Sequence, residues 1–107
     1  MIKKGSIILI PFPFTDLKGQ KVRPSIVLSA NNLGDIIVAF VSSKVDKIKN
    51  NDLLVKADDQ NCLKSDSKIV CSKLTTIDRK IILGKIGSLK TKQIQEIDKK
   101  LRSVFGI

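Results

Sequence analysis

The chain of 107 residues contains no histidine, and this narrows the chemistry available to its side chains. Histidine-based acid–base catalysis, Ser-His-Asp triads and Cys-His pairs are all removed. A two-metal nuclease needs several converging carboxylates, whereas acids such as Asp16, Asp35 and Asp78 are scattered singly along the chain. No glycine-rich phosphate loop ending in Gly-Lys-Ser/Thr is present. We therefore expect neither a metal ion nor a cofactor.

Two short segments remain as candidate sites. Arg23 precedes Pro24 where a polar loop meets a strand, and its guanidinium is suited to bidentate binding of a phosphate. Ser42, Ser43 and Lys44 directly follow an apolar run, and hydroxyls beside a lysine at a strand end can bind a phosphate or nucleotide. Taken alone, each segment is more simply explained as an ordinary strand end with surface side chains.

The charge balance points to a polyanionic partner. The formal net charge is +10, and residues 1–50 and 51–107 each contribute +5, so the charge is spread over the whole surface. Nucleic acid, an acidic protein or both would fit such a surface. The alternative is a lysine-rich surface that only keeps the protein soluble.

The elements that must position these residues are mainly short strands. Phe is the only aromatic residue type, so the core must consist mostly of Ile, Leu and Val, whose β-branched members favour strands. Pro11 and Pro13 restrict the first strand to an edge or end it, and Pro24 opens the second. Apolar runs between polar or turn-forming segments predict strands at residues 6–10, 24–28, 36–41, 53–55, 68–74 and 82–86.

The last part of the chain changes to helical spacing, with apolar residues at Ile94, Ile97, Leu101 and Val104. Thr91 is the expected N-cap and Gly106 the expected stop. Residues 44–51 are predicted to form a polar loop with one helical turn. We therefore predict a single domain over residues 1–107, mainly β with a C-terminal helix, arranged as a partly open antiparallel barrel.

The two cysteines indicate neither a zinc site nor a required disulfide. Cys62 and Cys71 are not in a CxxC pair, and Cys71 lies within an apolar run, as a small core residue would. The start of the chain is too short and too interrupted by proline for a signal peptide. No apolar stretch approaches the ~20 residues that span a bilayer. We expect a cytoplasmic protein with no membrane association.

Several segments, in order, resemble the MazF/PemK-like toxins of type II toxin–antitoxin pairs. Residues 5–19 and the following Val22-Arg23-Pro24 with its apolar run resemble the opening of these toxins. Residues 37–43, 66–70 and 73–79 resemble later parts of the family, and Gly87-Ser88-Leu89 resembles its lead into a final helix. The similarity extends over nearly the whole chain.

This resemblance implies an SH3-like barrel that forms a homodimer, cuts single-stranded RNA at short sequences without a metal, and is inhibited by a cognate antitoxin, expected to be acidic. The family's essential arginine before proline corresponds to Arg23, and its essential threonine at the end of the third strand corresponds to Ser42. The implied products are a 2′,3′-cyclic phosphate and a 5′-OH. We expect RNA contacts from the residues beside this pair or in the family's later motif: Lys21, Ser43, Lys44, Ser72 and Lys73.

Two other functions fit the same composition. The chain could be a non-catalytic basic barrel that binds nucleic acid, or a module that binds an acidic peptide. A barrel that binds bases by stacking would expose aromatic side chains along a basic groove. Phe12 and Phe14 are more simply explained as core or loop anchors, and the scarcity of aromatics counts mildly against a stacking module.

Overall fold

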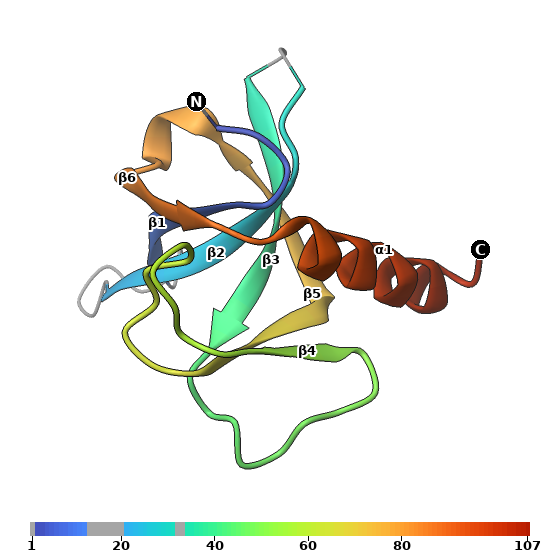
Figure 1. Ribbon diagram of the computed structural model, residues 1–107. Helices are drawn as coiled ribbons and strands as arrows, with labels where there is room; N and C mark the ends of the chain where they lie inside the picture. The colour runs from blue at the N-terminus through green and yellow to red at the C-terminus, as the bar shows by residue number, and fades with distance from the viewer. Residues whose placement is uncertain (1, 13–20, 32–33) are drawn as a thin grey trace.

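Six antiparallel strands and one long helix make up the computed structural model, which describes residues 2–12, 21–31 and 34–107 (Figure 1). The sheet order is β4-β5-β3-β2-β1-β6. The predicted fold class, a mainly β, partly open antiparallel barrel with a C-terminal helix, is confirmed. Predictions on residues 13–20 and on the side chain of Phe12 fall outside the described residues. The elements are β1 (Ser6–Phe12), β2 (Lys21–Ser29), β3 (Asp35–Ser42), β4 (Asp52–Val55), β5 (Ser67–Asp78), the 3₁₀ helix η1 (Arg79–Ile81), β6 (Gly84–Ser88) and α1 (Thr91–Phe105).

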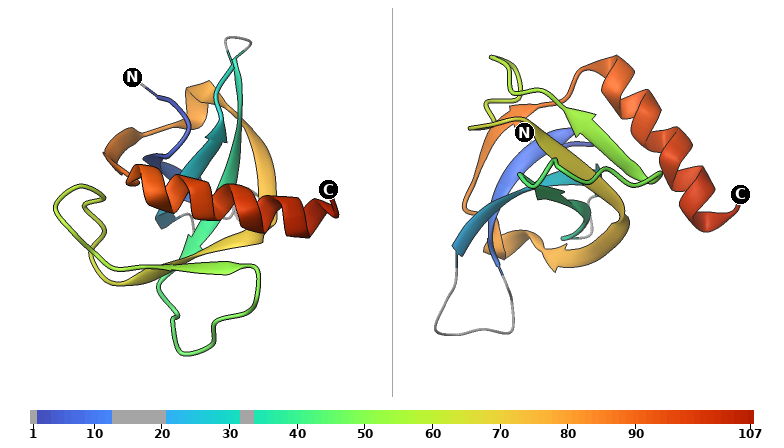
Figure 2. Two further views of the ribbon diagram at one scale, coloured as in Figure 1. Left: turned by 45° about the vertical axis from the view of Figure 1, so that its right-hand side comes forward. Right: turned by 90° about the horizontal axis from the view of Figure 1, so that it is seen from below.

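The central strands are buried on both faces, which explains their unbroken β-branched runs. Side chains of a strand alternate between faces, so Ile7 enters a core on the side of helix α1, while Ile8 enters a second core on the opposite face. Ile77 and the partly buried Ile81 of η1 help to cover the second core. The sheet is strongly curled, and the view from below in Figure 2 shows it as an open half-barrel.

Helix α1 covers the first core with the predicted apolar stripe. Ile97 is fully buried, and Ile94, Leu101 and Val104 pack against the same core. The N-cap is Lys90 and not Thr91 as predicted, because the Gln93 side chain accepts the Lys90 N–H at 2.9 Å. The helix ends as predicted at Gly106, whose φ of 70° is in the left-handed region that glycine adopts without strain. Within the described residues, no helix has the length and apolar character needed to cross a membrane.

Pro11 and Pro24 lie where a strand has a neighbour on one side only. Strand β1 continues past Pro11 to Phe12, but its pairing with β6 stops at Leu9, so Pro11 occupies an edge. Strand β2 begins at Lys21, three residues earlier than predicted, because its first residues pair with the end of β1. Pro24 pairs with Leu9, whereas the recorded pairing with β3 begins at Ser25. A missing N–H therefore interrupts no ladder between two neighbours.

Three other predictions on local structure were wrong or incomplete. Residues 43–51 contain bends and, at residues 50–51, one turn in which the Asp52 N–H donates to the Lys49 carbonyl at 3.0 Å, but no helix; the Asp52 side chain also accepts the Lys49 N–H at 2.9 Å. The 3₁₀ helix η1 was not predicted, and Asp78 caps it by accepting the Lys80 N–H at 2.8 Å. Strand β6 begins two residues later than expected because the chain first completes that turn.

Candidate functional site

Arg23 and Ser42 line one cavity at the ends of β2 and β3. The register between these strands pairs Ser25 with Phe40, and two residues further along it are Arg23 and Ser42. We call this space, of about 250 Å³, the strand-end cavity. Its lining is Arg23, Pro24, Ser25, Phe40, Val41, Ser42, Lys44, Val70 and Lys73.

An irregularity in β5 brings Lys73 to the strand-end cavity. Phe40 pairs with Val70 and its neighbour Ala39 pairs with Leu74, so three residues of β5 have no partner on β3. Extra residues of this kind bend a strand and redirect its side chains. Lys73 consequently lines the cavity, although strict alternation along β5 would place it on the same face as Ile69 and the buried Cys71.

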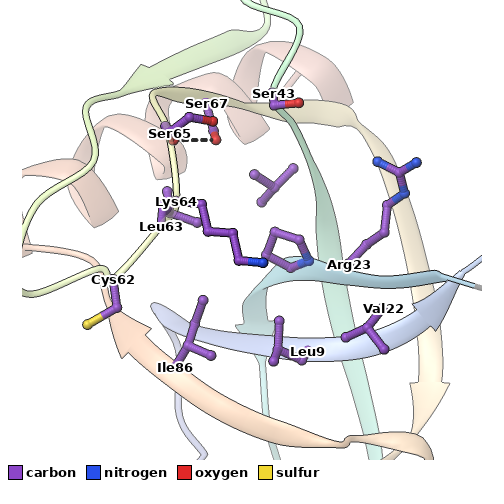
Figure 3. A pocket seen from close by; sticks show the side chains of 12 residues that line it. Leu9, Val22, Arg23, Ser43, Cys62, Leu63, Lys64, Ser65, Ser67 and Ile86 are labelled. Atoms are coloured by element: carbon purple, nitrogen blue, oxygen red, sulfur yellow. Dashed lines mark hydrogen bonds between the residues drawn. The ribbon is translucent and has the colours of Figure 1, made fainter.

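A second, larger cavity adjoins the first and shares Arg23, Pro24 and Val41 with it. This loop-side cavity has a volume of about 400 Å³ and is shown in Figure 3. Lys64 extends from the loop towards the middle of the cavity, on the side opposite Arg23. The full lining is Leu9, Val22, Arg23, Pro24, Val41, Ser43, Cys62, Leu63, Lys64, Ser65, Ser67 and Ile86.

The electrostatics of both cavities favour an anion. Arg23, Lys44, Lys64 and Lys73 contribute positive charge, and no Asp or Glu is among the described residues that line either space. Lys44 also fixes the nearby hydroxyl, because its backbone N–H donates to Ser42 Oγ at 3.2 Å. The arrangement combines a planar guanidinium, a hydroxyl and two ammonium groups around one opening, which suits a phosphate on a polyanionic chain.

The wall of the loop-side cavity is a loop at residues 56–66 that is held by its own side chains. Asn61 is buried; its Oδ1 accepts the N–H groups of Asp58 and Leu63, each at 3.0 Å, and its Nδ2 donates to the carbonyl of Lys56 at 2.9 Å. Asp58 Oδ1 in turn accepts the N–H groups of Asn61 and Gln60. These bonds, together with Lys90 nearby, hold the pKa of the Asp58 carboxyl below its ordinary value, so the carboxylate remains ionised and able to accept both bonds at neutral pH.

A buried ion pair holds the opposite loop, residues 43–51, which carries Ser43 and Lys44. Asp52 is 5% exposed, and its Oδ2 lies 3.5 Å from Lys68 Nζ and accepts the Lys49 N–H at 2.9 Å. Lys68 Nζ also donates to the carbonyl of Lys47 at 2.6 Å. From helix α1, the Lys100 ammonium donates to the carbonyl of Asn50 at 2.9 Å. The loop is therefore tied to both the sheet and the helix.

Replacing Lys68 with methionine is expected to lower the free energy of unfolding by about 3 kcal/mol, because it leaves the Asp52 carboxylate buried without its cation. Urea unfolding followed by circular dichroism measures the change. Lys56→Met is the matched control, since Lys56 is exposed and its side chain is in no ion pair among the described residues; it should change stability by less than about 0.5 kcal/mol. Equal stability of the two variants would show that the ion pair is unimportant.

The structure brings most of the predicted site residues together. Arg23, Ser42, Lys44 and Lys73 share the strand-end cavity, and Ser43 lines the loop-side cavity. Two predicted contacts, Lys21 and Ser72, are not among the described residues that line these two cavities: Lys21 is exposed at the start of β2, and Ser72 is exposed on the irregular part of β5. In the part of the chain that the structure describes, no three His, Cys, Asp or Glu side chains are grouped as a metal site requires.

Residues 56–66, Lys64 among them, were not predicted to contribute to the site, because they lie between two predicted strands and contain no phosphate-binding motif. The run Asp58-Asp59-Gln60-Asn61 was the available signal, because Asp and Asn side chains form hydrogen bonds to backbone N–H groups two or three residues away. This local pattern predicts a structured loop, but it does not predict that the loop borders the cavity that contains Arg23.

Comparisons with known proteins point to one family. The family model described as the PemK-like, MazF-like toxin of type II toxin–antitoxin systems matches residues 3–105. Among solved structures, the Mycobacterium tuberculosis toxin MazF-mt6 is 22% identical, with a TM-score of 0.76 over 95% of this chain and 97% of that one. MazF from Deinococcus radiodurans is 17% identical, with a TM-score of 0.78 over 99% and 97% of the two chains.

A third similar structure is an endoribonuclease in complex with its cognate antitoxin from a mycobacterial species. It is 12% identical to this chain, with a TM-score of 0.78 over 100% of this chain and 97% of that one. At these identities the structural matches show a shared fold. No curated protein sequence matches the chain significantly.

Proposed function

Because the chain belongs to the family of PemK-like, MazF-like toxins of type II toxin–antitoxin systems, we propose that it is a sequence-specific endoribonuclease that cuts single-stranded RNA without a metal ion. The observation that carries the proposal is the shared cavity of Arg23 and Ser42, with Lys44 and Lys73 beside them and no carboxylate among the lining residues that the structure describes. Such a set can bind a phosphate and stabilise added negative charge, but it offers no ligands for a divalent cation.

The proposed reaction is attack by a ribose 2′-OH on the adjacent phosphorus. The bond to the 5′-oxygen of the next nucleotide breaks, which leaves a 2′,3′-cyclic phosphate and a 5′-OH. The proton lost by the 2′-OH is balanced by the proton gained by the leaving 5′-oxygen. Arg23 stabilises the charge that develops on the non-bridging oxygens. Ser42 forms a hydrogen bond to the phosphate or to the attacking hydroxyl, while Lys44 and Lys73 bind flanking phosphates.

Incubation of the purified protein with a long single-stranded RNA in EDTA tests this proposal. We expect a limited set of fragments with cyclic phosphate at one end and a free 5′-OH at the other. Activity that disappears in EDTA and returns with magnesium would contradict the metal-free mechanism. If the protein binds RNA but cuts none under any condition, the non-catalytic nucleic-acid-binding barrel becomes the better description.

We also propose that a cognate antitoxin with an acidic, partly disordered segment inhibits the protein, as the +10 net charge favours. The association rate should fall markedly as salt rises, because salt screens the attraction that steers the encounter. Stopped-flow measurement between about 50 and 500 mM salt checks this, with the dissociation rate as an internal comparison. An association rate that does not change with salt would contradict the electrostatic basis.

We expect the functional unit to be a homodimer. A chain of 11.8 kDa buries a limited fraction of its surface alone, and the family resemblance implies a dimer. Light scattering at micromolar concentration should give twice the chain mass. A monomer at that concentration would contradict this expectation.

A further inference from the structure

Lys64 is the cation of the site that the proposed reaction leaves without a role. It lies across the loop-side cavity from Arg23 (Figure 3). Within the described residues, the recorded ion pairs involve Lys4, Lys68 and Lys90, and none involves Lys64. An exposed ammonium at the edge of a cavity whose described lining residues include no Asp or Glu is available to an external anion.

The backbone that carries Lys64 is already fixed. The buried Asn61 holds the loop from within through three hydrogen bonds. Strand β6 also fixes the loop, because the Ser88 N–H donates to the carbonyl of Gln60 at 3.0 Å. After Lys64, the Ser67 hydroxyl donates to the carbonyl of Ser65 at 2.9 Å, as Figure 3 shows. A cation on a preorganised backbone loses less entropy on binding than one on a loop that must first become ordered.

The floor between the two cations is apolar. Leu9, Pro24 and Ile86 are among the residues that line the cavity, and Figure 3 shows Leu9 and Ile86 below Lys64. Arg23 borders both cavities, so a chain whose phosphate lies at Arg23 can continue from the strand-end cavity into the loop-side cavity. In a single-stranded nucleic acid, each phosphate is followed by a ribose that carries a flat base with apolar faces, which matches a cavity with a cation at either side and apolar side chains between them.

We propose that Lys64 binds the backbone phosphate next to the one held by Arg23, and that the loop-side cavity holds the sugar and base between these two phosphates. This inference rests on the proposed function, since it takes RNA as the ligand. Lys64 acts on substrate binding, because the phosphate it contacts is not the one that reacts. The loop 56–66 is then a preformed part of the RNA-binding surface.

Lys64→Ala and Lys56→Ala form a matched pair for the test. Both residues are exposed on the same loop and carry the same charge, but Lys56 lines neither cavity. The probe is a mixed-sequence RNA with 2′-O-methyl groups, which lacks the nucleophile and remains intact. Lys64→Ala should weaken binding about two- to fivefold and lower the slope of log K against log salt by roughly 0.7. In cleavage of ordinary RNA it should raise KM and leave kcat within about twofold.

Equal affinities and salt slopes for Lys64→Ala and Lys56→Ala would overturn the inference. That result can occur while the wild type still cuts RNA, so it would leave the proposed function intact. Conversely, a wild type that cuts no RNA but shows Lys64-dependent binding would contradict the enzymatic function and support the binding site.

Discussion

Replacing Arg23 with alanine is expected to lower the rate of RNA cleavage about 10²–10³-fold, the typical cost of removing a preorganised donor to a developing oxyanion. The expectation follows from the position of Arg23 beside Ser42 in a cavity without acidic side chains among its described lining residues. The fold should survive, because the Arg23 side chain is exposed and belongs to neither core. Single-turnover cleavage of a long RNA in EDTA measures the loss, and unfolding in urea checks the stability.

Two further variants show whether the loss of cleavage in Arg23→Ala comes from the missing guanidinium geometry or only from the missing charge. Arg23→Lys retains the charge but loses the planar fork that can bind two phosphate oxygens, so it should rescue activity poorly. Arg102→Ala also removes one arginine, but from an exposed position in the last turn of helix α1. This variant should cleave RNA at nearly the wild-type rate. Full activity in Arg23→Ala would contradict the proposed site. An equal loss in Arg102→Ala would indicate a non-specific effect of net charge.

Ser42 can be tested in the same assay. Ser42→Ala should reduce cleavage, because it removes the hydroxyl that lies beside Arg23 in the strand-end cavity. Ser42→Thr should retain or raise activity, since the added methyl limits the rotamers of the hydroxyl.

Replacing Gly87 with alanine is expected to lower the free energy of unfolding by about 3 kcal/mol, at the upper end of the usual cost of overpacking. A Cβ at this position of β6 would overlap the backbone oxygens of Gln60 and Asn61. Backbone cannot rotate away as a flexible side chain can, so either β6 or the loop 56–66 must move. The hydrogen bond from the Ser88 N–H to the Gln60 carbonyl would then be strained or lost.

Gly84→Ala is the matched control for this prediction. Gly84 lies on the same strand, and a Cβ there would meet no atom within 4 Å. Its effect on stability should be within about 0.5 kcal/mol. If Gly87→Ala is as stable as Gly84→Ala in urea unfolding, the contact between β6 and the loop is looser than the structure indicates. If Gly87→Ala is destabilised as expected, the loop that carries Lys64 depends on this close approach.

The local sequence pattern was sufficient to predict most of the strands and the helix, and to select Arg23 and Ser42, the central pair of the candidate site. Apolar runs rich in Ile and Val determine strands because β-branched side chains pack well on a pleated surface. The helical spacing of Ile94, Ile97 and Leu101 determined the face of α1 that meets the core, and Gly106 determined its end. Arg23 and Ser42 could be selected from sequence because each lies at the end of an apolar run, where side chains reach the surface, and because the resemblance assigned them a role.

The boundaries of the strands depended on their partners. Lys21 to Arg23 carry no apolar run, yet they belong to β2 because the end of β1 pairs with them. The same holds for the long strand β5, whose C-terminal part is in register with the start of β3. Strand pairing joins segments that are far apart in sequence, so a window of neighbouring residues contains no information about it.

Tertiary structure alone decided which side chains surround the central pair. Three unpartnered residues of β5 turn Lys73 into the strand-end cavity, against the alternation that the sequence predicts. Lys64 reaches the loop-side cavity because its loop packs on Gly87, a residue more than twenty positions away. Composition and period determine that a residue is in a strand, a helix or a loop. Which distant residues a loop meets is determined by packing, and here packing places the cations around one cavity.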